Sequence, residues 1–247
     1  MKVLVSVIIP TLGRETLYEL VNNLLKQKVN FDYEIILIAQ ARLDKNLLKN
    51  KKIKIFNEET GKGISYYRNL GIKKSKGKIL VFIDDDENPI NEFWLEKIAN
   101  PIIENKERVT TSGVKIKLGQ EYLTDSISLL GFPGGGAIGF RTIWKVNKNN
   151  YTDHLCSGNF AIDKKLILGI GMFSEDLKIG NEDVNLADKI NKSKVKIKYI
   201  EEAVVYHVAR KGFKNFIKWN YLRGKSAGEY LSSNKKGNKI TERLNSS

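Results

Sequence analysis

GKILVFIDDDE, at Gly77–Glu87, joins an apolar run directly to three consecutive aspartates. The five residues from Ile79 to Ile83 are mostly β-branched or aromatic and too few for a buried helix, so they predict a strand that is covered on both faces. Asp84, Asp85 and Asp86 then fall at its carboxyl end, which is the edge where open α/β sheets bind ligands. If the backbone stays extended, Asp84 and Asp86 point one way and Asp85 the other.

Three adjacent carboxylates repel one another unless a cation neutralises them. A divalent ion that carries a diphosphate would do so, because Mg²⁺ and Mn²⁺ take carboxylate and phosphate oxygens together. The alternative is a solvated acidic turn that caps a helix starting near Pro89. The rest of the chain has to decide between these two interpretations.

Composition is that of a soluble globular protein, with 41% hydrophobic and 28% charged residues in 247. Apolar runs stay well short of the ~20 residues that span a bilayer. The opening MKVLVSVIIP resembles a signal peptide only loosely, since it stops at Pro10 without a cleavage site, and it predicts a first strand instead. A single cysteine, Cys156, cannot form an internal disulfide, which fits a reducing cytoplasm.

The net charge is +14 and the isoelectric point is near 9.6, which favours anionic partners: nucleotides, nucleic acid or an acidic membrane face. A lysine-rich composition typical of the source organism would be the other explanation. The excess is uneven, because the segment from Tyr206 to Thr241 holds one acid, Glu229. Its bases are Arg210, Lys211, Lys214, Lys218, Arg223, Lys225, Lys235, Lys236 and Lys239.

The first half alternates predicted strands and helices, which implies right-handed parallel crossovers and a nucleotide-binding α/β unit. The strands are expected at residues 3–9, 31–39, 53–56 and 79–83, and the last helix before the aspartates at Tyr66–Lys74. Gly61-Lys62-Gly63 resembles the start of a dinucleotide fingerprint. Tyr66 occupies its third glycine position and the motif does not follow the first strand, so a dehydrogenase is disfavoured.

The second half is less regular and is expected to end in a basic helix with an aromatic stripe, followed by a loose tail from Ser232. A glycine-rich stretch at Gly131–Gly139 suits a loop that gates a site or a tip without a role. The other expected elements are a helix at Trp94–Ile102, a strand at Val109–Leu118, a strand at Leu155–Ala161, a helix at Lys164–Gly169, a helix beginning at Glu182-Asp183, and strands at Lys194–Ile200 and Ala203–Tyr206.

A second group of acids, Glu182 and Asp183, stands at this predicted helix start. Capping and the helix dipole explain such acids structurally, whereas projection into a cleft would make them functional. His207 follows the last strand and is either packed or, near the aspartates, a metal ligand. Cys156 lacks a supporting histidine motif and is not expected to act as a nucleophile.

Six motifs together resemble family-two, GT-A-type glycosyltransferases, the inverting nucleotide-sugar enzymes. The resemblance covers Val3 to about Lys225 and implies a single α/β domain with a Rossmann-like, mostly parallel central sheet and helices on both faces. It divides into a nucleotide-sugar half, about residues 1–105, and an acceptor half, about 106–225, before a basic, flexible tail at 226–247. The motifs are PTLGRETL, SYYRNLGI, KGKILVFIDDDENPINEFWLE, SGNFAI, GMFSEDLKIGNEDVNLADKI and VVYH.

The resemblance also implies roles for individual residues. Asp86 would hold the metal, with His207 completing that site, and Asp183 would be the general base with Glu182 as its neighbour. The residues implied to bind the donor or its sugar are Pro10, Thr11, Arg14, Gln40, Arg68, Asp84, Asp85, Gly158 and Asn159.

One departure concerns the turn after the second strand. The family usually carries an acidic turn there with glycine and serine, and this chain has Ile38-Ala39-Gln40-Ala41-Arg42. The Gln40 amide can still pair with a base edge.

The sequence therefore predicts a cytoplasmic, Mn²⁺- or Mg²⁺-dependent inverting hexosyltransferase that moves a sugar from a UDP- or GDP-sugar to a hydroxyl of a glycan or lipid-linked glycan. Docking on the anionic cytoplasmic face of a membrane is a further hypothesis, raised by the basic, aromatic end. The alternatives are a polyanion- or nucleic-acid-binding protein, although no nucleic-acid motif is visible, a sugar nucleotidyltransferase, and a non-catalytic relative.

Overall fold

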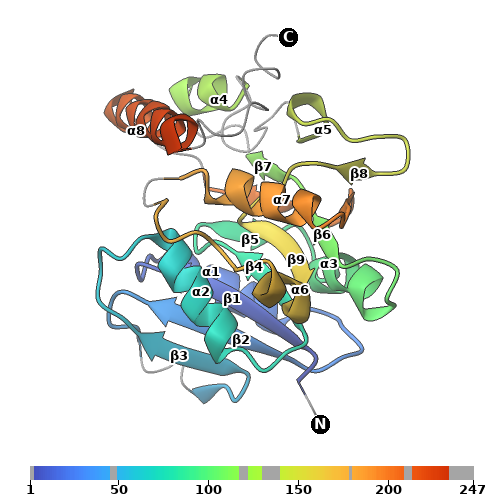
Figure 1. Ribbon diagram of the computed structural model, residues 1–247. Coiled ribbons are helices and arrows are strands. Elements are labelled where there is room, and N and C mark those ends of the chain that lie inside the picture. The colour runs from blue at the N-terminus through green and yellow to red at the C-terminus, as the bar shows by residue number, and fades with distance from the viewer. Residues whose placement is uncertain are drawn as a thin grey trace.

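A computed structural model describes residues 3–44, 49–116, 122–129, 140–177, 180–208 and 213–233. The described chain forms a central sheet with helices packed against it, and α4, α5 and α8 lie at the top of Figure 1. The sheet has eight strands in the order β3-β2-β1-β4-β9-β6-β10-β8. The layered arrangement places the ends of the central strands under the upper helices.

Four strands of the first half pair in parallel, as the sequence predicts: β1 (Val5–Thr11), β2 (Tyr33–Ala39), β3 (Ile53–Asn57) and β4 (Ile79–Ile83). Their crossovers contain α1 (Thr16–Leu25) and α2 (Ile64–Lys74). Because β2 and β3 lie on one side of β1 and β4 lies on the other, the strand order reverses between β1 and β4. Ligands of open α/β sheets bind at this switch point.

Side chains that alternate along the strands fill a separate core on each face of the sheet. Val5, Val7 and Ile9 pack with α1 and with α3 (Trp94–Ile103). Ile8 packs on the opposite face with α2, α6 (Lys164–Gly169) and α7 (Glu182–Lys192). Burial of both faces explains the uninterrupted apolar runs of β1, β2 and β4.

The second half extends the sheet with shorter strands. β9 (Asn159–Asp163) runs antiparallel between β4 and β6 (Val109–Thr111), and β10 (Ile197–Tyr199) and β8 (Tyr151–Thr152) complete the sheet. The prediction of a strand over Leu155–Ala161 was wrong at its start. A turn precedes β9 instead. In this turn the Asn159 amide donates to the Cys156 carbonyl at 2.9 Å. The sheet is nevertheless large and mostly parallel, with helices on both faces, as expected.

A second, three-stranded sheet corrects one prediction and removes one of the alternatives that the sequence left open. It contains β5 (Glu87–Pro89), β11 (Val205–His207) and β7 (Val114–Ile116). Pro89 therefore lies in a strand and does not start a helix, and the single strand predicted over Val109–Leu118 is divided between two sheets. The division occurs at Gly113, where a Cβ would lie 3.1 Å from the Phe140 Cβ, so the close packing there favours glycine.

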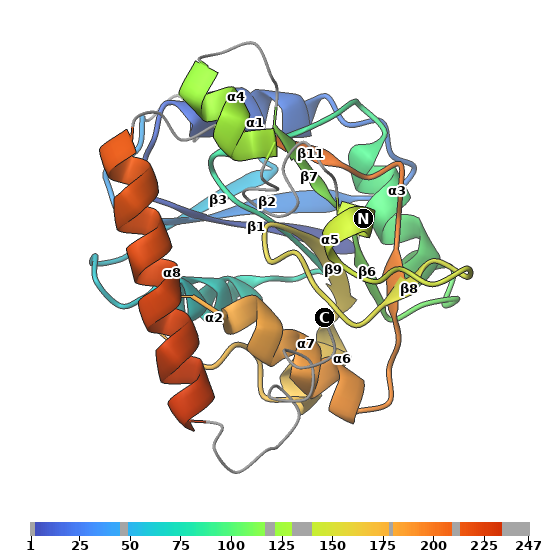
Figure 2. The same cartoon turned by 90° about the horizontal axis from the view of Figure 1, so that it is seen from above.

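The upper helices are α4 (Tyr122–Leu129), the short α5 (Phe140–Ile143) and α8 (Phe213–Ser233). Figure 2 shows the long α8 along one border of the molecule, with α4 beside one of its ends. The boundary expected at Lys225 falls inside α8. The Gly131–Gly139 loop and the tail after Ser233 lie outside the described residues. Within the described ranges, no helix combines the length and apolarity needed to cross a bilayer.

Candidate active site

The acidic turn, Asp84–Asp86, joins β4 to β5 at the switch point of the sheet. The Glu87 amide donates to the Asp84 carbonyl at 3.1 Å, so the backbone turns here and is not extended. The predicted alternation of the aspartates was therefore wrong. Asp85 and Asp86 both accept from Arg14, at 2.8 and 2.7 Å, whereas Asp84 accepts from Arg68 at 2.8 Å.

Asp85 fastens the acidic turn to the end of β1. One of its oxygens accepts from the Thr11 hydroxyl at 2.7 Å and from the Leu12 amide at 3.1 Å, and only 4% of the residue is exposed. Burial raises the pKa of Asp85, and the Thr11 hydroxyl and the Arg14 charge offset part of that rise. In this arrangement Asp85 shapes the site by holding two strand ends together.

Asp86 faces His207 because β11 pairs with β5. The Val208 amide donates to the Asp86 carbonyl at 2.9 Å, and His207 Nε2 lies 3.5 Å from Asp86 Oδ1. His207 Nδ1 lies 2.6 Å from the Val208 carbonyl oxygen, to which an Nδ1–H donates, and this contact turns the Nε2 edge of the ring toward Asp86. Both residues line the same cavity, so this nitrogen and this oxygen lie beside each other on its wall.

This pair suits a divalent cation that takes its remaining ligands from elsewhere. Over the described residues, no group of three or more histidine, cysteine, aspartate or glutamate side chains could hold a metal ion by itself. Asp86 and His207 offer two ligands of the type that Mn²⁺ accepts, and phosphate oxygens and water would supply the others. The donor set therefore fits a metal that binds together with a phosphorylated ligand.

Arg68 connects the acidic turn with the start of α7. Its guanidinium is 1% exposed and donates to Asp84 and Glu182, each at 2.8 Å. Burial acts to lower the pKa of Arg68, but the charges of Asp84 and Glu182 outweigh it, so the pKa is raised and the group stays charged. The predicted nucleotide contact of Arg68 remains a prediction, because this side chain lies behind the acidic turn and outside the cavity lining.

Glu182 and Asp183 begin α7 but differ in their surroundings. Glu182 is 8% exposed and accepts from Arg68 and, at 3.3 Å, from the Ser157 hydroxyl. Asp183 is half-buried and one of its oxygens accepts from the Val184 amide at 2.8 Å. Through Arg68, the structure brings this second acidic group close to the first, although Asp183 itself does not line the cavity.

Glu87 is a buried carboxylate that the sequence analysis did not single out. It is 3% exposed, and its Oε2 accepts from the Asp84 amide at 3.1 Å. Burial, followed by the charges of Asp84 and Asp86, raises the pKa of Glu87 well above its ordinary value. Desolvation and the charge of Glu87 likewise raise the pKa of the Cys156 thiol, which disfavours a cysteine nucleophile. Position alone, directly after the aspartates, could have indicated Glu87.

Gly158 and Asn159 lie beneath the acidic turn and outside the cavity lining. A Cβ on Gly158 would clash with the Glu87 carboxylate. Asn159 is fully buried, accepts from the Trp94 indole at 3.1 Å, and donates to the Gly113 and Ala203 carbonyls at 2.9 and 2.8 Å. These contacts support the site from below, and the sugar or acceptor contacts predicted for this pair stay untested.

A cavity of about 470 Å³ opens over the acidic turn and collects most of the predicted donor and metal residues. The predicted residues among its lining are Pro10, Thr11, Arg14, Gln40, Asp84, Asp85, Asp86 and His207. The sequence analysis missed Leu12, Gly61, Gly63, Ile64 and Tyr67. The glycine motif before α2, set aside as a dinucleotide fingerprint, was the signal for several of these.

Gly61 and Gly63 have positive φ angles, +90° and +88°, which non-glycine residues rarely adopt. Gly63 is the residue before α2, so the unpaired amides of the first helical turn begin at the cavity. Helix starts of this kind favour anionic groups. The cavity therefore combines an acidic wall suited to a metal with backbone amides and Arg14 suited to phosphate.

Solved structures with the same fold include glycosyltransferases. The mannosyltransferase PcManGT from Pyrobaculum calidifontis, in complex with GDP-Man and Mn²⁺, superimposes with a TM-score of 0.68 at 15% identity, over 97% of this chain and 66% of that one. S. aureus TarS 1–349 in complex with UDP-GlcNAc gives 0.63 at 21% identity, over 85% and 60%. GalNAc-T7 with UDP, GalNAc and Mn²⁺ gives 0.61 at 19% identity, over 85% and 44%. These similarities establish a GT-A-type fold.

Sequence similarity identifies the family to which the chain belongs. An uncharacterized glycosyltransferase of Haemophilus influenzae is 31% identical over 110 residues, which are 41% of this chain and 43% of that protein. The minor teichoic acid biosynthesis protein GgaB of Bacillus subtilis is 25% identical over 221 residues, 83% of this chain and 23% of that protein. The chain thus spans less than half the length of these relatives. Since the Glycosyl transferase family 2 profile matches residues 6–168, this chain belongs to that family.

Proposed function

We propose that this protein is a metal-dependent inverting glycosyltransferase that moves a sugar from a UDP- or GDP-sugar to a hydroxyl of a glycan or lipid-linked glycan. The observation that carries the proposal is the convergence of the acidic turn, His207, Arg14 and Gln40 on one cavity at the switch point of the sheet. The name of the GgaB relative, which refers to teichoic acid biosynthesis, supports an acceptor in glycan assembly.

The donor fits this cavity with its diphosphate toward Asp86 and Arg14. Arg14 lines the cavity, and because its side chain is 45% exposed it can move to contact an anionic ligand. Gln40 replaces the family's acidic turn and presents an amide that pairs with a base edge as donor and acceptor. Tyr67, whose hydroxyl donates to the Glu59 carbonyl at 2.7 Å, keeps the neighbouring wall of the cavity in place.

Asp86 and His207 would hold a Mn²⁺ or Mg²⁺ ion, which when bound neutralises the diphosphate of the leaving group. His207 is oriented for this task by its Nδ1 contact with the Val208 carbonyl. Arg14 adds positive charge beside the same group. Asp86, His207 and Arg14 would therefore position the leaving group together.

Asp183 takes the proton of the acceptor hydroxyl as that oxygen attacks the anomeric carbon. The bond between the sugar and the diphosphate breaks on the opposite side, the nucleoside diphosphate leaves, and the configuration at that carbon inverts. Glu182 cannot share this role easily, since Arg68 and Ser157 both donate to it. Arg68 instead fixes the start of α7 relative to the acidic turn.

Thermal unfolding in the presence of nucleotides tests donor binding. UDP or GDP with Mn²⁺, at about 100 times the dissociation constant, should raise the melting temperature by roughly 5–10 °C. Asp86→Asn should lose the part of the shift that requires Mn²⁺, whereas the exposed control Asp176→Asn should keep it. Failure of both nucleotides to stabilise the wild type would favour the non-catalytic alternative.

Substitution of the proposed base tests the mechanism. Asp183→Asn should reduce release of UDP or GDP from the matching sugar donor by about 10²- to 10⁴-fold, because the amide that replaces the carboxylate cannot take the proton. The nucleotide-dependent rise in melting temperature should be unchanged, and Asp176→Asn should retain activity. Turnover of Asp183→Asn equal to wild type would remove Asp183 as the base.

A further inference from the structure

α8 carries an apolar stripe that points away from the protein. Phe213, Ile217 and Tyr221 follow one another at four-residue spacing, and 58%, 51% and 71% of each is exposed. The buried positions Ser226 and Tyr230 lie on the opposite side of the same helix, since a helix completes a turn every 3.6 residues. The stripe is therefore neither a core face nor a contact with α7.

Two hydrogen bonds fix the direction in which α8 presents this stripe. The Asn181 amide donates to the Ser226 hydroxyl at 2.7 Å, and the Tyr230 hydroxyl donates to Asp188 at 2.8 Å. Both partners belong to the start or body of α7. With its buried side fastened to α7, α8 must direct Phe213, Ile217 and Tyr221 outward.

Basic side chains run along one border of the stripe. Lys214, Lys218 and Lys225 are exposed and occupy helix positions next to those of the apolar residues. In the sequence from Phe213 to Gly228 every charged residue is basic. This combination, large apolar side chains beside lysines on the same helix, is the pattern of helices that lie in the plane of an anionic lipid surface.

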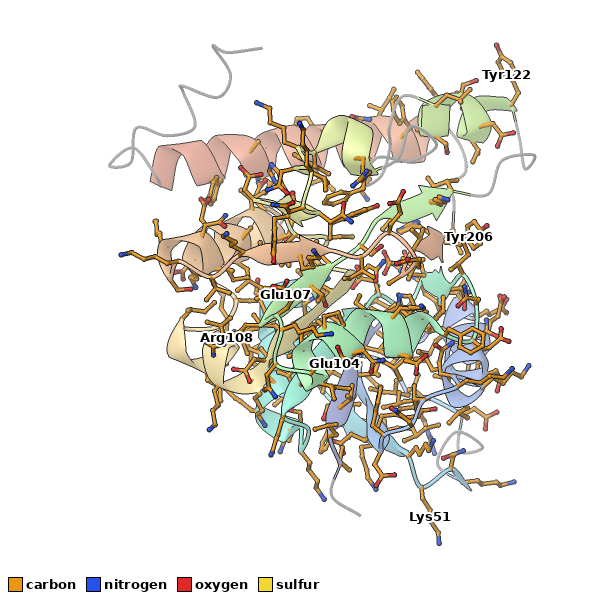
Figure 3. All side chains as sticks on the ribbon, turned by 90° about the vertical axis from the view of Figure 1, so that its right-hand side faces the viewer. Lys51, Glu104, Glu107, Arg108, Tyr122 and Tyr206 are labelled. Carbon is orange, nitrogen blue, oxygen red and sulfur yellow. The ribbon has the colours of Figure 1, made fainter. Side chains whose placement is uncertain are left out.

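α4 extends the same surface. It lies beside one end of α8 in all three views, and Figure 3 shows Tyr122 projecting outward from it. Tyr122 is 91% exposed and Leu129 is 57% exposed. Aromatic side chains of this kind reside at the level of lipid head groups.

We propose that the outward face of α8, together with Tyr122 and Leu129 of α4, docks on an anionic lipid bilayer. The apolar stripe enters the boundary between head groups and acyl chains, and the flanking lysines contact lipid phosphates. Phe213 follows His207 by only six residues, so docking through α8 brings the candidate site close to the lipid surface. The surface is independent of the transfer reaction, and its test needs no donor or acceptor.

Vesicle co-sedimentation of the full chain tests the proposal. The protein should bind vesicles that contain phosphatidylglycerol and stay in the supernatant with pure phosphatidylcholine. Phe213→Ser/Ile217→Ser should weaken partitioning by at least about tenfold, because two exposed apolar side chains no longer enter the interface. The matched control Phe93→Ser/Leu168→Ser removes one exposed phenylalanine and one exposed aliphatic residue elsewhere and should bind like wild type.

The charge contribution is tested in the same way. Lys214→Ala/Lys218→Ala should reduce partitioning by about tenfold or more, whereas removal of the exposed Lys26 and Lys54 should have a smaller effect. Equal recovery of the wild type in both supernatants would overturn the proposal, and so would binding that survives Phe213→Ser/Ile217→Ser. A dimer in solution that this variant dissociates would assign the surface to a second copy of the chain instead.

Discussion

Two arginines hold the acidic turn from opposite sides, and their surroundings differ sharply. Arg14 reaches Asp85 and Asp86 from the cavity with 45% of its side chain exposed, whereas Arg68 reaches Asp84 and Glu182 from below with 1% exposed. The hydrogen-bond distances are nearly the same. Solvent exposure, and not the contact geometry, therefore distinguishes the two arginines. Arg14 can exchange its carboxylate partners for a ligand, whereas Arg68 cannot.

The difference follows from solvation. Water screens an exposed ion pair and competes for both partners, so such pairs contribute little and dissociate readily. A buried charge that loses its partner has no water to replace it. We therefore expect the Arg14 side to respond to ligands and the Arg68 side to act as a fixed support.

The largest effect is expected for Arg68→Met. It leaves Asp84 and Glu182 without their shared cation and should lower the free energy of unfolding by about 3–5 kcal/mol. Urea unfolding followed by tryptophan fluorescence measures this. Arg68→Lys keeps the charge but cannot donate to both carboxylates in the same geometry, so its free energy of unfolding should fall between those of the wild type and Arg68→Met. A change below 1 kcal/mol for Arg68→Met would contradict the comparison.

A smaller effect is expected for Gly158→Ala, on the same buried side. The new methyl group would meet the Glu87 carboxylate, which cannot move freely because it is buried and accepts from the Asp84 amide. The cost should be about 1–3 kcal/mol in urea unfolding. Gly169→Ala is the matched control, since nothing lies within 4 Å of its added Cβ. Equal stability of the two variants would mean that Glu87 is not held rigidly.

The smallest effect on stability is expected for Arg14→Met, below about 1 kcal/mol. Removal of this cation should nevertheless raise the affinity for Mn²⁺ alone by about two- to tenfold, because less positive charge faces Asp86. Isothermal titration measures the affinity. Arg108→Met, which removes another exposed partner of an aspartate, is the control and should leave Mn²⁺ binding unchanged. Weaker Mn²⁺ binding by Arg14→Met would show that Arg14 orders the site.

Much of the fold could be predicted because local patterns agree with it. The apolar runs of β1, β2 and β4 and the helices expected at Tyr66–Lys74 and Trp94–Ile102 agree within a few residues with the elements observed. Errors occurred where tertiary packing determines the backbone. The split at Gly113 and the strand at Pro89 both depend on β11, a segment about 90 residues later in the chain than Gly113.

The candidate site shows the same division. Asp84–Asp86, Glu182, Asp183 and His207 could be named because acids after a strand, acids at a helix start and a late histidine are visible in sequence. Their connection through Arg68 could not, because it requires knowing that α2 and α7 pack on the same face of the sheet. The position of Gly158 beneath Glu87 and the burial of Asn159 could not be predicted either, because burial of this kind has no sequence signature.

By itself, the sequence determined that an apolar strand ends in three carboxylates within an alternating α/β chain, since side-chain chemistry and periodicity are local properties. Only the tertiary structure decided which carboxylates meet the exposed Arg14, which one is tied to the buried Arg68, and which side of α8 is left exposed. The physical reason is solvation. Whether a charge or an apolar side chain meets water depends on every element packed around it, and that information is distributed over the whole chain.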